Sequence, residues 1–170
     1  MEFKASDAEM SRAKKLHSVL LFDFIVIHIF VFVLAISMIK STRLPLFIMV
    51  GLSLASLVYV MFKARQSLAN EPSHFVRCHH LLAAKRARLF LILFLVTGTF
   101  TAVMFFGGAQ FGLSPIAAKS LAFGIGQLPF MVSLLVLVVL EFDAEHQCKS
   151  SQIPAAALAL HPATGAANNG

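Results

Sequence analysis

Positions 16–39, near the N-terminus, read LHSVLLFDFIVIHIFVFVLAISMI, an apolar run that includes Asp23 and two histidines, His17 and His28. A helix needs ~20 apolar residues to cross the ~30 Å hydrocarbon core of a bilayer, so this run is long enough to span one. Three further apolar runs follow, at 45–62, 89–107 and 115–140. Together they predict an all-α polytopic membrane protein, a four-transmembrane-helix bundle made of two antiparallel hairpins.

The composition supports this fold class. Of the 170 residues, 58% are hydrophobic and 13% are charged, which is more apolar surface than a soluble domain of this length can bury. We therefore expect a cytoplasmic N-terminal arm at 1–15, a transmembrane domain at 16–149 with a cytoplasmic loop at 63–88, and a disordered tail at 150–170. The sequence lacks a phosphate-binding glycine loop, a nucleophile elbow and an HExxH motif, so we do not expect an enzyme.

The 14 Lys and Arg residues predict the orientation of the chain. Eleven fall on the side of the N-terminus, the 63–88 loop and the C-terminal segment, and three on the other side: Lys40, Arg43 and Lys119. Because positive charge marks cytoplasmic loops, we expect a multi-pass protein of a cell inner membrane with both termini cytoplasmic. A signal peptide is the alternative for the first run, but that run exceeds an apolar core of about 7–15 residues and contains Asp23.

The charge balance also bears on partners. The isoelectric point near 9.8 suits anionic lipid headgroups. No basic–aromatic motif for nucleic acid is present, so we expect no nucleic-acid partner.

Several turn signals predict where the helices begin and end. Pro45 and Ser114-Pro115 suit helix starts, and Gly107-Gly108 suits a helix end. Pro72 biases Glu71 away from helix, with a helical segment expected after Ser73. Pro129 predicts a kink near Gly126, because it removes a backbone donor inside the fourth span.

Polar residues within the spans are candidates for function, because ionisable groups are costly in lipid. They are Asp23 and His28 in the first span and Gln127 in the fourth. On an α-helix Asp23 and His28, five residues apart, are about 140° apart, so we do not expect a tight pair. His28 is a possible axial ligand of haem b, with His17 as a second candidate paired with His79 or His80.

The densest set of metal-ligand residues precedes the third span. Residues four apart on a helix share a face, as in zinc-binding helices, so His74 and Cys78 face the same way. His79 and His80 adjoin them, and His146 and Cys148 lie on the same membrane side. These residues offer a transition-metal site for zinc or copper, whereas the alternative is an interfacial helix whose histidines contact headgroups.

Pairs of small residues four apart predict close helix packing. The pairs are Gly51 and Ala55, Gly98 and Ala102, and Ala122 and Gly126.

These pairs favour a non-catalytic accessory or assembly subunit of a larger membrane complex, with other membrane subunits or a second copy as partner, and no cofactor. The alternative function is a haem- or metal-binding membrane redox protein. A third is a proton- or ion-coupled transporter that uses Asp23.

Overall fold

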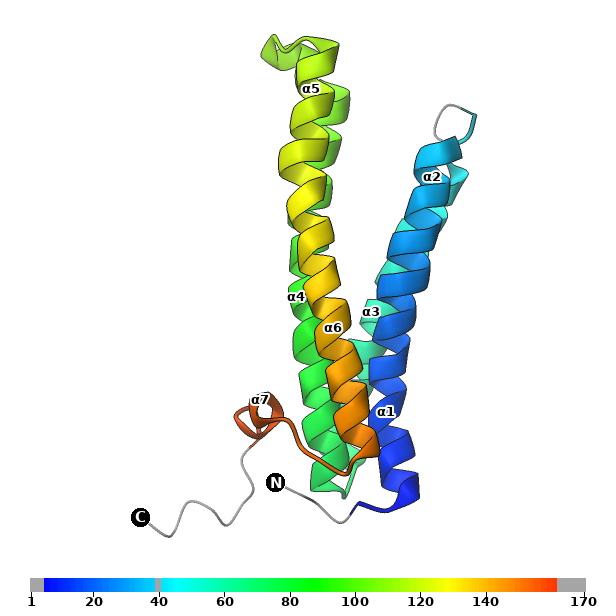
Figure 1. Ribbon diagram of the computed structural model, residues 1–170, viewed down its shortest axis with the longest axis vertical. Coiled ribbons are helices and arrows are strands. Elements are labelled where there is room, and N and C mark those ends of the chain that lie inside the picture. The colour runs from blue at the N-terminus through cyan, green and yellow to red at the C-terminus, as the bar shows by residue number, and fades with distance from the viewer. Residues whose placement is uncertain (1–4, 39–40, 162–170) are drawn as a thin grey trace. The chain divides into compact units, whose positions relative to one another are not determined.

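The computed structural model of the chain describes residues 5–38 and 41–161, and this part contains four helical rods long and apolar enough to cross a membrane (Figure 1). The all-α prediction is confirmed. The rods run over Asp7–Met38, Leu44–Asn70, His74–Phe111 and Pro115–Lys149. Their elements in chain order are α1 (Asp7–Phe22), η1 (Asp23–Val31), α2 (Phe32–Met38), α3 (Leu44–Asn70), α4 (His74–Gly107), η2 (Gly108–Phe111), α5 (Pro115–Leu121), η3 (Ala122–Gln127), α6 (Leu128–Lys149) and α7 (Ala155–Leu158).

The helix ends follow local sequence signals. Ser6 and Glu9 form a reciprocal capping box at the start of α1: the Ser6 side chain accepts from the Glu9 N–H, and the Glu9 carboxylate accepts from the Ser6 N–H at 2.8 Å. Ser114 caps α5 by accepting from the Ala117 N–H. Glu71 is extended before Pro72, so the predicted break is present.

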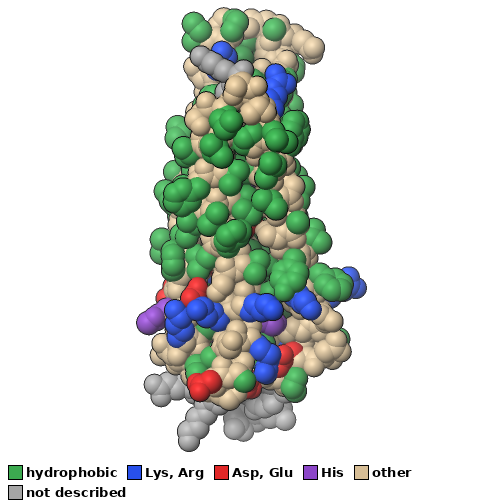
Figure 2. Space-filling model, turned by 90° about the vertical axis from the view of Figure 1, so that its right-hand side faces the viewer, with side chains coloured by type: hydrophobic (Ala, Val, Ile, Leu, Met, Phe, Trp, Pro, Cys, Tyr) green, Lys and Arg blue, Asp and Glu red, His purple; other side chains and the backbone are tan. Residues whose placement is uncertain are grey.

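The chain divides into two compact units, which are described separately. The first contains residues 1–88 and 138–170, and the second contains residues 89–137. In the first unit, α1, η1 and α2 pack along α3. Figure 2 shows hydrophobic side chains over the middle of this hairpin and Lys and Arg side chains gathered nearer its N-terminal end.

Two predictions about the segments of the first unit need correction. The connection predicted as a cytoplasmic loop at 63–88 is much shorter, because α3 continues to Asn70 and α4 begins at His74. The helical segment expected after Ser73 is present as the first turns of α4. The tail is ordered as far as residue 161, since Ile153 and Ala157 are buried in an apolar cluster with Phe75. Residues 162–170 of the tail lie outside the described residues, as do Lys4, Lys40 and Ile39.

In the second unit, two glycines permit close approach of backbones. A Cβ on Gly126 would lie 2.2 Å from Thr101 Oγ1, and a Cβ on Gly108 would lie 2.4 Å from the Ala118 Cβ. Gly126 belongs to the π-helix η3, which ends just before Pro129. A widened turn at the predicted kink is consistent with the backbone donor that proline lacks.

The predicted small-residue pairs differ in their surroundings. Ala122 and Gly126 are buried, whereas Gly51, Ala55, Gly98 and Ala102 are exposed. Apart from the local backbone of its own helix, a Cβ built on Gly51 or Gly98 would have no described atom within 4 Å.

A Cβ at Gly108 would meet a neighbouring side chain and one at Gly98 would not, so substituting each glycine by alanine should change the free energy of unfolding in opposite directions. We expect Gly108→Ala to lower the free energy of unfolding by about 1–3 kcal/mol, because the new methyl overlaps the methyl of Ala118. We expect Gly98→Ala to raise it by about 0.5–1 kcal/mol, because alanine loses less backbone entropy in a helix. Denaturant unfolding in detergent micelles measures both changes.

The double variant Gly108→Ala/Ala118→Gly serves as the control, since it removes the methyl that the new Cβ meets. It should recover most of the loss. Equal stability of Gly108→Ala and wild type would contradict the close packing.

Candidate metal centre

Three buried side chains of the first unit bring their ligand atoms together. His17 comes from α1, His79 from α4 and Cys148 from α6, and their ligand atoms all lie within 4.8 Å of one another. The side chains are fully buried. The cluster thus unites His79 and Cys148, predicted as metal ligands, with His17, predicted as a haem ligand.

One ring nitrogen of His17 is engaged by a carboxylate. His17 Nδ1 lies 2.5 Å from Glu141 Oε2, with both side chains fully buried. A carboxylate only accepts hydrogen bonds, so Nδ1 carries the proton. In the neutral imidazole, His17 Nε2 therefore presents a lone pair to the cluster.

His79 is oriented in a comparable way by the ordered tail. His79 Nε2 lies 3.0 Å from the carbonyl oxygen of Gln152, to which it donates. The ring of Phe75 packs against that of His79 with the centroids 4.8 Å apart. In the neutral ring, His79 Nδ1 is then the unprotonated nitrogen.

The two lone pairs face each other. His79 Nδ1 lies 3.3 Å from His17 Nε2 and 3.2 Å from Cys148 Sγ. Two nitrogen acceptors at this distance repel unless a proton or a cation lies between them. The thiol of Cys148 donates to only one of them.

The spacing is close to that of a metal site. Metal–nitrogen bonds of about 2.0–2.1 Å, at angles of about 109–120°, separate two ligand nitrogens by roughly 3.3–3.6 Å. The nitrogens of His17 and His79 meet this condition. The Cys148 sulfur would move away from His79 by a few tenths of an ångström to accommodate a metal–sulfur bond of about 2.3 Å.

The outer contacts of the histidines also match those of metal ligands. Metal-bound histidine almost always donates its other N–H to a carboxylate or to a backbone carbonyl. Glu141 supplies the first kind of acceptor and Gln152 the second. Glu141 is itself held by Arg86, whose Nη1 lies 3.2 Å from Oε1 and donates to the carbonyl of Leu140 at 2.8 Å.

Haem does not fit this pair of histidines. Axial ligation on opposite faces of one iron requires nitrogens about 4 Å apart, at roughly 2.0 Å each, with the macrocycle between them. The 3.3 Å separation of His17 and His79 leaves no such space.

The other predicted metal ligands lie elsewhere in the first unit. His74 and Cys78 share a helix face as expected, with Cys78 Sγ 3.6 Å from His74 Nε2, and both contact the His161 carbonyl. His80 donates to the Arg12 carbonyl at 3.1 Å. His146 is exposed on α6.

The intramembrane residues include one further correction. Asp23 and His28 lie on the same side of the helix, with His28 Nδ1 3.8 Å from Asp23 Oδ2, although this distance is longer than a hydrogen bond. The expected separation of 140° assumed an α-helix, but Asp23–Val31 is a π-helix, whose i→i+5 hydrogen bonds align residues five apart. Gln127 lies half-buried at the end of η3 in the second unit.

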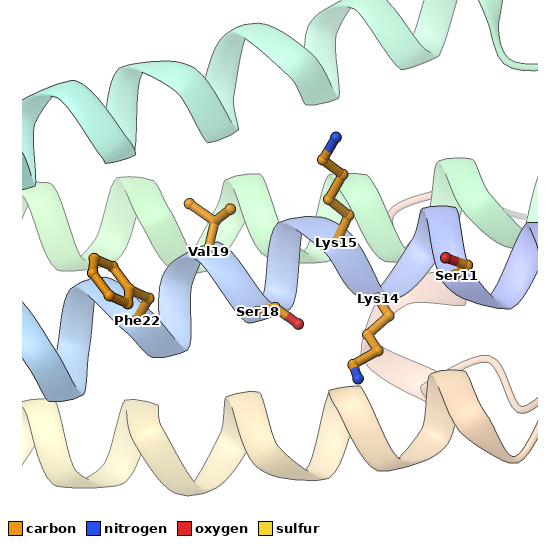
Figure 3. A pocket seen from close by; sticks show the side chains of 6 residues that line it. All are labelled: Ser11, Lys14, Lys15, Ser18, Val19 and Phe22. Atoms are coloured by element: carbon orange, nitrogen blue, oxygen red, sulfur yellow. The ribbon is translucent and has the colours of Figure 1, made fainter.

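A separate hollow lies on α1. Its volume is about 450 Å³. None of its lining residues belongs to the metal cluster, which consists of His17, His79 and Cys148. Figure 3 shows the six side chains that line the hollow: Ser11, Lys14, Lys15, Ser18, Val19 and Phe22. The lining combines two lysines and two serine hydroxyls with the apolar side chains of Val19 and Phe22. This combination suits the predicted anionic headgroups, which stay a prediction.

Sequence reasoning missed three contributors to the metal cluster: Glu141, Arg86 and the Gln152 carbonyl. For Glu141, the position along its membrane-spanning helix could have indicated this contact. His17 is the second residue of the first apolar run, and Glu141 directly follows the last run. Antiparallel spans bring these two positions to the same membrane level.

Comparison of the chain with protein-family models, with curated protein sequences and with solved structures gives no match.

Proposed function

We propose that this chain is a metal-binding protein of a cell inner membrane, which holds one Cu(I) ion between His17, His79 and Cys148. The observation that carries the proposal is the pair of facing imidazole lone pairs with a thiol beside them. The positive-charge bias favours a cytoplasmic location for this end of the helices.

A metal ion can bind all three ligand atoms of the site, whereas a proton can join only two of them. A proton on His17 Nε2 would join the two imidazoles and leave Cys148 as a bystander. A soft cation engages both nitrogens and the sulfur, and thiolate is the ligand type that favours Cu(I) and Zn²⁺. The carboxylate and carbonyl behind the histidines would fix their tautomers in the required form.

Charge favours Cu(I) over Zn²⁺. Glu141 and Arg86 already form an ion pair beside the cluster at 3.2 Å. The positive charge of Cu(I) and the negative charge of the Cys148 thiolate cancel, whereas Zn²⁺ with one thiolate would leave a net positive charge among fully buried groups. Three ligands without an approach for water also suit a cation that does not require a fourth.

The buried site supports a holding role for the metal rather than a catalytic one. Catalytic metal sites keep an open position for water or substrate, and the three ligand side chains here are fully buried. This is compatible with an accessory subunit that supplies metal to a larger membrane complex. The exposed small-residue pairs are available for such a partner, which stays a prediction.

The two cysteines provide a matched test, because both are buried free thiols in one apolar cluster. Full-length protein is purified from cells grown with added copper, and metal per chain is measured by mass spectrometry. We expect about one copper in wild type and in Cys78→Ser, but strongly reduced copper in Cys148→Ser, because only Cys148 contacts the histidine pair.

Helix content and elution volume of each variant show that it is folded. Wild type without stoichiometric metal, or equal loss of copper from both cysteine variants, would overturn the proposal. Stoichiometric zinc in place of copper would overturn the choice of metal.

A second prediction concerns the carboxylate behind His17. We expect Glu141→Gln to weaken Cu(I) binding by ~10–100-fold, because the neutral amide orients the His17 ring less strongly than the carboxylate does. Competition with a chromophoric Cu(I) chelator measures the affinity.

Glu145→Gln is the control, since Glu145 pairs with Lys14 and Lys149 and not with the histidines. Equal affinities of the two variants would contradict the role given to Glu141.

A further inference from the structure

A second polar group lies within the first hairpin and does not belong to the metal cluster. Asp23 and Ser53 are completely buried, and His28 is 1% exposed. Ser53 Oγ donates to Asp23 Oδ2 at 3.3 Å, which links η1 to α3. Ionisable residues at this position in a span are rare and are functional candidates by default.

The π-helix creates this arrangement. In η1 the His28 ring lies close to Asp23, and His28 Nδ1 lies 3.2 Å from the backbone carbonyl of Asp23, to which it donates. This hydrogen bond requires the proton on Nδ1, as in the corresponding tautomer of the neutral imidazole.

Among the contacts that the structure describes, Asp23 has no counter-charge within hydrogen-bond distance. His28 Nδ1 is 3.8 Å from the carboxylate, beyond hydrogen-bond distance, so a charged Asp23–His28 pair would be poorly compensated. Among the contacts described within the first unit, α1, α2 and α3 pack on η1. The residues of α2 contain no titratable side chain. The first titratable residue of α3 along the chain is Tyr59, which is 36% exposed, and the last one of α1 before Asp23 is His17, which is engaged by Glu141.

We propose that Asp23 is a proton-binding site inside the membrane, occupied as a neutral carboxylic acid in the resting protein, with Ser53 donating to its carbonyl oxygen. The ligand is the proton itself. A lone carboxylate in this setting would bury an uncompensated charge, whereas the acid buries none and keeps its hydrogen bond from Ser53.

Infrared spectroscopy of the full chain in lipid nanodiscs at neutral pH tests this assignment. We expect a C=O stretching band of a protonated carboxylic acid that disappears in Asp23→Asn. Asp143→Asn is the matched control, because Asp143 is exposed and its carboxylate accepts from Gln147 at 2.6 Å. That control should leave the band unchanged.

Ser53→Ala provides a second readout that does not depend on Asp23→Asn folding. Loss of the hydroxyl donor should shift the band to higher frequency without removing it. The proposal is overturned if wild type shows no such band, if the band is unaffected by both changes, or if it is lost in Glu141→Gln, the variant of the other buried carboxylate.

Discussion

Lipid does not solvate polar groups, and this constraint explains most of the structure. A backbone N–H or C=O in the hydrocarbon core must find its partner within the chain, so the apolar runs form helices. The same rule acts on side chains. Glu141 is compensated by His17 and Arg86, and Asp23 by Ser53, in each case through a residue from another helix.

The two π-helices show how a span adapts to a polar or irregular residue. In η1 the wide turn brings His28 to the carbonyl of Asp23. In η3 the wide turn precedes Pro129, where the backbone lacks a donor. Widened turns of this kind occur frequently at functional sites, because they change which residues share a face.

The sequence predicted the four spans, the break at Pro72 and the cap at Ser114, since each depends on local composition or on a single side chain. The metal cluster was predicted only in part, because its ligands come from three helices and their contacts depend on tertiary packing. Cys148 and His79 were named, but they were grouped with His146 and His80 by proximity in sequence. Asp23 and His28 were separated because α-helical geometry was assumed throughout the first span.

Chemical identity alone does not distinguish the two cysteines, but their neighbours do. Cys78 contacts the His161 carbonyl and a half-buried His74, one turn before it on the same helix. Cys148 contacts His79, whose tautomer is fixed by a carbonyl that belongs to the ordered tail. The tail therefore does more than pack against the helices: the Gln152 carbonyl accepts the proton of His79 Nε2, which leaves the lone pair on Nδ1, the nitrogen nearest His17 and Cys148, while Phe75 packs against the ring.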